Sequence, residues 1–180
     1  MPLSPDQMGI VRGSALALAI AGATLAAAWA WLPAQSMGVA PGFDAGERLV
    51  YALKTALPVF LWLAIAIRGV SGRRFTSPAD IRGSAFAPPS PELKVPVAIL
   101  QNSLEQTVLF MGAHLILAAV LRDGELVLLP TMVLLYMAGR VCFAVGYARG
   151  ASGRAFGMAL TAGPTIFGLV TAGVLMGLGR

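Results

Sequence analysis

Polar side chains interrupt an apolar run at Ile99–Phe110, which reads ILQNSLEQTVLF. At 100° per residue, Asn102 and Glu105 share one face of a helix, and Gln101 lies at the edge of that face. A carboxylate inside a membrane is costly, so it faces the protein interior or a polar cavity and commonly marks a functional site. These three residues are therefore candidates for binding a polar ligand.

A second polar group lies in the next apolar run, Leu126–Ala148. Arg140 and Tyr147 share one face of a helix there, and Arg154 follows seven residues after Tyr147. At 1.5 Å per residue, Glu105 and Arg140 lie at similar depths, roughly 12–15 Å from the same membrane boundary. We expect them to form a buried ion pair, because each charge offsets the cost of burying the other.

Two interpretations of that pair remain open at this point. In the first, the pair is structural and fixes the register of two helices. In the second, Asn102, Arg140 and Tyr147 line a cleft that opens toward a membrane face carrying Arg149 and Arg154. Such a cleft suits an anionic, amide-rich small molecule, because Arg and Asn side chains bond carboxylate and amide groups.

The composition places these residues in a membrane protein. Of 180 residues, 57% are apolar and only 12% are charged, against about 25% in soluble domains. The chain has one cysteine and one histidine, which exclude an internal disulfide and predict no metal site. His114 points about 120° away from Asn102 on a helix, so we expect a packing role for it. Basic residues flank the apolar runs without forming a patch, which argues against nucleic-acid binding.

Five apolar stretches are long enough to cross a hydrocarbon core of ~30 Å, which takes about 20 residues. They are Val11–Leu32, Leu49–Ile67, Val95–Leu121, Leu126–Ala148 and Ala155–Leu178. The first imitates a cleavable secretory signal, but its uncharged run is longer than the apolar part of such signals, so we expect a retained helix. The segment Ser71–Lys94 is rich in Pro, Ser and Gly and is predicted to be a loop without regular structure. The sequence therefore predicts an all-α integral membrane protein.

Five spans place the two termini on opposite sides of the membrane. Most basic residues then share one side: Arg12, Arg68, Arg73, Arg74, Arg82, Lys94, Arg149 and Arg154. The positive-inside rule makes this side cytoplasmic. We expect the N-terminus inside, the C-terminus outside, and a bacterial inner membrane as the location.

The stretch LQNSLEQTVLF, followed in the next span by GRVCFAVGYARGASGR, resembles the MAPEG family, the membrane-associated proteins in eicosanoid and glutathione metabolism. The resemblance extends from about Leu49 to the C-terminus. It implies a four-helix membrane bundle over residues 49–180, preceded in residues 1–48 by an additional transmembrane helix and a connecting loop. It also implies a homotrimer that holds glutathione in clefts between subunits.

The same resemblance assigns roles to individual residues. Asn102 and Glu105 match the pair that contacts glutathione in the family, and Gln101 completes this side of the expected site. Arg140 and Tyr147 match cleft residues of the adjoining helix. Arg154 matches the arginine that stabilises the glutathione thiolate in several members, and is the expected catalytic residue. The implied activity is a glutathione-dependent transferase or peroxidase that acts on lipophilic electrophiles from the bilayer.

Two other classes of function fit the same residues. One is a non-catalytic membrane bundle with a structural Glu105–Arg140 pair, and the other is a binding or scaffold protein for an anionic metabolite or lipid headgroup. Transport is disfavoured, because the polar face turns apolar beyond Leu109. The spacings Gly146/Gly150 and Gly153/Gly157 are typical of helices that approach closely in membranes.

Overall fold

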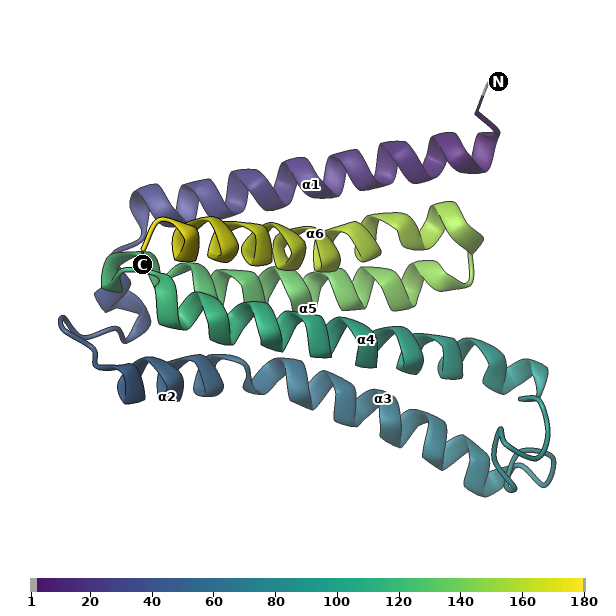
Figure 1. The fold of residues 1–180 in the computed structure, drawn as a ribbon. Helices are drawn as coiled ribbons and strands as arrows, with labels where there is room; N and C mark the ends of the chain where they lie inside the picture. Colours follow the sequence, from purple (N-terminus) through teal and green to yellow (C-terminus); the bar gives the residue numbers. More distant parts are fainter. Residues whose placement is uncertain (1–2, 180) are drawn as a thin grey trace.

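The helices run back and forth along one axis (Figure 1). A computed structural model describes residues 3–179. The regions expected at residues 1–48 and 49–180 therefore each extend slightly beyond the described residues. The elements are α1 Pro5–Trp31, η1 Ala34–Met37, α2 Ala45–Thr55, α3 Leu57–Thr76, α4 Pro91–Val120, η2 Asp123–Glu125, α5 Leu128–Tyr147 and α6 Gly150–Gly177. Five segments are long and apolar enough to cross a membrane, with α2 and α3 counted as one. The prediction of an all-α membrane protein with five spans is confirmed.

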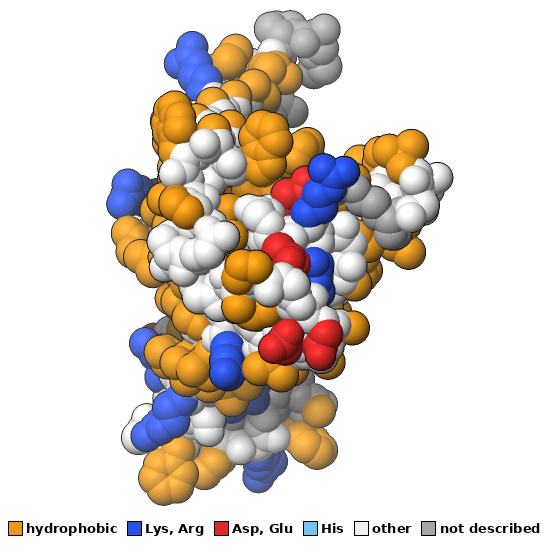
Figure 2. All heavy atoms as spheres, turned by 90° about the vertical axis from the view of Figure 1, so that its left-hand side faces the viewer, with side chains coloured by type: hydrophobic (Ala, Val, Ile, Leu, Met, Phe, Trp, Pro, Cys, Tyr) orange, Lys and Arg blue, Asp and Glu red, His pale blue; other side chains and the backbone are white. Residues whose placement is uncertain are grey.

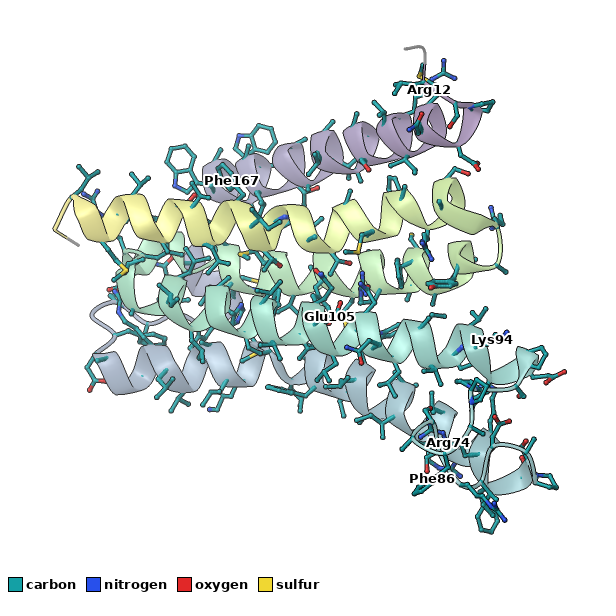
Figure 3. All side chains as sticks on the ribbon, turned by 45° about the vertical axis from the view of Figure 1, so that its right-hand side comes forward. Arg12, Arg74, Phe86, Lys94, Glu105 and Phe167 are labelled. Carbon is teal, nitrogen blue, oxygen red and sulfur yellow. The ribbon has the colours of Figure 1, made fainter. Side chains whose placement is uncertain are left out.

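The two ends of the bundle differ in charge. At one end α1 begins, α3 connects to α4, and α5 turns into α6 (Figure 1); Arg12, Arg74 and Lys94 lie there (Figure 3). We call this the basic end. The opposite end carries the α1–α2 and α4–α5 connections, and Figure 2 shows acidic side chains on that face, with Lys and Arg side chains beside them. The arrangement of the helices therefore brings these three basic residues to one end of the bundle, as the sequence predicted.

An ion pair ties the helices together at the opposite end. Arg48 of α2 pairs with Asp123 of η2, and its guanidinium also donates to the carbonyl oxygens of Ala118 and Leu121. These carbonyls end α4, so a charged donor satisfies groups that the helix itself leaves unpaired. The contact fixes the α2–α4 register at this membrane boundary.

The second span is longer than expected and is interrupted at Ala56. Asp44 caps α2 through a reciprocal capping box with Glu47. Pro58 lacks an amide proton, and α3 starts beside it as a separate helix. The interruption therefore occurs where the sequence removes a backbone donor.

The prediction of a loop over Ser71–Lys94 is partly wrong. Helix α3 continues to Thr76, and α4 starts at Pro91, a residue suited to the first turn of a helix. The connection is thus residues 77–90. Asp80 organises it by accepting hydrogen bonds from the Ser77 hydroxyl (2.7 Å) and the Ser90 amide (2.8 Å), and these bonds lower the pKa of its carboxyl group.

Glycines let α5 and α6 approach each other closely. A Cβ atom at Gly157 would overlap the backbone of Phe143, and one at Gly146 would overlap the carbonyl group of Gly153. The expected close approach is present at Gly146, Gly153 and Gly157. Gly150 does something else: its φ of +82° makes the turn between the two helices.

Gly157→Ala is expected to destabilise the protein by about 1–3 kcal/mol, because the added methyl group must push two helix backbones apart. Thermal unfolding in detergent measures the effect. Gly173→Ala is the matched control. Gly173 lies on the same helix, and a Cβ atom there would meet nothing within 4 Å. Equal melting temperatures for the two variants would contradict the close approach.

Candidate functional site

A cleft of about 500 Å³ opens near the basic end between α1, α5 and α6, with α4 contributing one residue. Asn102, Tyr147 and Arg154, all predicted site residues, line it together. The remaining lining residues are Ile10, Ser14, Phe143, Ala151, Ala155, Met158 and Ala159. The structure thus brings together three of the six predicted residues in a single cavity.

Arg140 lies directly behind this cleft and is fully buried. Its guanidinium donates to Asn102 Oδ1 at 2.7 Å and to Thr161 Oγ1 at 3.1 Å. It also lies over the ring of Phe143, 4.5 Å from the centroid, where a cation is attracted to the aromatic face. Arg140 therefore joins α4, α5 and α6 and orients Asn102 at the wall of the cleft.

The expected Glu105–Arg140 ion pair is wrong. Glu105 is exposed at the surface of the single chain and accepts a hydrogen bond from Gln101 Nε2 at 3.0 Å. Within residues 3–179, the ion pair that the structure contains is the one between Arg48 and Asp123. Three residues advance a helix by 300°, which leaves Asn102 and Glu105 about 60° apart. That rotation lets Asn102 meet Arg140 of α5 and leaves Glu105 exposed. Glu105 lies about halfway along the bundle (Figure 3).

Arg154 lies over the ring of Tyr147, with 4.6 Å between its guanidinium carbon and the ring centroid. Tyr147 in turn meets the ring of Phe143 edge-on at 5.3 Å. Since α6 begins at Gly150, Arg154 lies near its N-terminus, where the helix dipole adds positive potential. The cleft therefore ends in a half-buried cation close to the membrane boundary, which favours an anionic ligand group.

Sequence reasoning missed several residues of the site. Thr161 follows Arg154 by seven residues, so heptad spacing could have placed the two on one face of α6. Ile10 and Ser14 belong to α1 and carried no recognisable signal, because their role depends on how α1 packs against α6. The structure reveals that α1 forms part of the cleft wall.

Two other reactive side chains lie away from the cleft. His114 is fully buried, and its Nε2 is 3.0 Å from Thr55 Oγ1, in keeping with a packing role. Cys142 is exposed. In the part of the chain that the structure describes, no group of three His, Cys, Asp or Glu residues could hold a metal ion.

The fold and the cleft define a multi-pass α-helical membrane protein with a cleft between its helices that ends in a cation. The chain belongs to the MAPEG family, whose model matches residues 49–174. It is thus a membrane protein of the glutathione and eicosanoid metabolism family, with α1 preceding the matched region. No curated protein and no solved structure matches the chain.

Asn102→Leu is expected to destabilise the protein by about 1.5–3 kcal/mol, because it removes the shortest hydrogen bond to a buried guanidinium. Thermal unfolding in detergent reports the loss. The matched control is Gln101→Leu, which changes the neighbouring amide and removes only its bond to the exposed Glu105. If the control loses as much stability as Asn102→Leu, Arg140 does not depend on Asn102.

Proposed function

We propose that this protein binds glutathione in the cleft and activates its thiol for attack on lipophilic electrophiles. The observation that carries the proposal is the position of Arg154, stacked on Tyr147 in the same cleft as Asn102. A cation beside a thiol favours the thiolate, and each unit of lowered pKa corresponds to about 1.4 kcal/mol. Arg154 is the catalytic residue of this proposal.

The reaction follows from that arrangement. The glutathione thiol releases its proton to water, and the thiolate is held near the Arg154 guanidinium. The sulfur then donates an electron pair to an electrophilic carbon, and the leaving group departs with the electrons of its bond. With a hydroperoxide as the electrophile, the sulfur would attack the outer oxygen, and the O–O bond would break to release an alkoxide that takes up a proton. A second glutathione would then convert the resulting sulfenic acid to the disulfide and water, so the two chemistries share thiolate formation.

Asn102 and Tyr147 hold the ligand in this proposal, while Arg140 acts through Asn102. Because Asn102 Oδ1 is occupied by Arg140, the amide group is fixed with its nitrogen available to a ligand carbonyl or carboxylate. The Tyr147 ring is fixed between Phe143 and Arg154. Positioned polar groups of this kind orient a bound tripeptide before reaction.

Arg154→Ala is expected to retain part of the glutathione binding but to lose the thiolate absorbance and turnover with an activated aryl halide. Arg154→Lys keeps the charge and loses the planar guanidinium, so it should retain part of the thiolate signal. Titration of each purified variant with glutathione, followed by ultraviolet absorbance, measures glutathione binding and the thiolate signal.

Arg149→Ala is the matched control for charge, since Arg149 is exposed at the same end of the bundle and does not line the cleft. It should leave the thiolate signal unchanged. Full thiolate signal and normal turnover in Arg154→Ala would contradict the proposed role of Arg154 in stabilising the thiolate. Arg154 would then serve only to set the orientation of the chain in the membrane.

The proposal includes a homotrimer. Glu105 and Gln101 are exposed on the outer face of α4 within a membrane span. A carboxylate that faces lipid is costly, so a second copy of the chain would cover this face and bring Glu105 to the glutathione amino group. The membrane lipids, glutathione and a lipophilic substrate are then the partners, with the basic end cytoplasmic and a bacterial inner membrane as the location.

Native mass spectrometry in detergent is expected to show three copies of the wild-type chain. Glu105→Lys should weaken this assembly, because it places a cation at the covered face near the basic residues of the cleft. Glu92→Lys makes the same charge change in the first turn of α4, near the membrane boundary, and should leave the assembly intact. A wild-type monomer would argue against both the trimer and a site shared between subunits.

A further inference from the structure

A second, larger cavity of about 670 Å³ lies between α1 and α6, on the far side of the bundle's midpoint from the cleft. Of its 17 lining residues, Glu125 and Thr171 alone carry polar side chains. Helices α4 and α5 close its back through Leu117 and Met132, which are both only 3% exposed. Its volume falls within the range of small-molecule sites.

The cavity exists because small residues on α1 and α6 leave the space between the two helices unfilled. A Cβ atom at Gly22 would meet nothing within 4 Å, so the α1 wall is hollow at that point. Toward the basic end, the side chain of Leu18 occupies the space that a Cβ at Gly163 would need. This contact and the buried cluster that includes Ala17 and Leu160 separate the cavity from the polar cleft.

The mouth of the cavity faces the membrane. Leu18, Trp29 and Phe167 border it and are each about half or more exposed, although all three lie in membrane spans. Phe167 projects from α6 on the side of α1 (Figure 3). Because the surroundings are hydrocarbon and the lining is apolar, water is a poor occupant and an alkyl chain is a suitable one.

The length and position of the cavity match one leaflet. Leu18 and Trp29 are eleven residues apart, about 16 Å along a helix, which is half of a hydrocarbon core of ~30 Å. The cavity runs from mid-membrane to the opposite end, where Trp29 and Glu125 lie close to the boundary. Tryptophan is typical of that boundary. A chain entering from the leaflet at this end would therefore fill it lengthwise.

We propose that this cavity binds one acyl chain of a phospholipid and that α1 creates the site. The leaflet that borders the mouth of the cavity supplies phospholipid chains, and these are the proposed occupant. Since α1 lies outside the region matched by the family model, the site is an addition to the four-helix bundle. It is separate from the cleft and does not depend on glutathione chemistry.

Photo-crosslinking from a defined bilayer tests the proposal. The full-length protein is placed in nanodiscs of phosphatidylcholine in which part of the lipid carries a diazirine at mid-chain, and labelled residues are mapped by mass spectrometry. Leu117 and Met132 are buried, so a label on either requires a chain inside the cavity. Leu134, 70% exposed on α5, reports contact with bulk lipid.

Gly22→Leu fills the cavity and is expected to lower the labelling of Leu117 and Met132 several-fold relative to Leu134. Gly173→Leu, also at an open position in a membrane helix but outside the cavity, should leave the ratio unchanged. Ala26→Leu fills the same cavity and serves if Gly22→Leu does not fold. Glutathione titration of the filled variant should match that of the wild type.

Three outcomes would overturn the proposal. The first is a wild-type protein without label on Leu117 or Met132. The second is a filled variant that folds and is labelled at Leu117 and Met132 as strongly as the wild type. The third is labelling that appears only when a diazirine fatty acid replaces the phospholipid.

Discussion

The buried guanidinium of Arg140 holds the functional half of the molecule together. It bonds Asn102 on α4 and Thr161 on α6 from its own position on α5, and it lies over the ring of Phe143. A buried charge without such partners would cost several kcal/mol, so the three helices must keep the register that supplies them. The cleft exists because this register also brings Tyr147 and Arg154 together.

Close contact between α5 and α6 makes that register possible. The glycines that face each other there leave no room for a Cβ atom, so the Arg140 side chain reaches Thr161 within hydrogen-bond distance. Aromatic rings then connect the buried cation to the half-buried one, with Phe143 and Tyr147 lying between the two arginines. A rigid wall of this kind suits a site whose proposed task is to hold a thiolate near Arg154.

Helix α1 adds to the family bundle in two places along its contact with α6. Near the basic end, Ile10 and Ser14 form one side of the polar cleft, and farther along the same seam, Leu18 to Trp29 enclose the apolar cavity. Small residues such as Ala17 hold the helices close between the two spaces. One added helix thus borders both the polar cleft and the apolar cavity.

The sequence by itself determined the number of spans, the basic end and the family, because apolar runs, charge distribution and a motif are local patterns. Only the tertiary structure decided which residue meets Arg140. Periodicity places Asn102 and Glu105 on one broad face, but the rotation of α4 against α5 gives the contact to Asn102 and leaves Glu105 outside. The part played by α1 was equally hidden, since Ile10 and Ser14 acquire a role only from the surface they pack against.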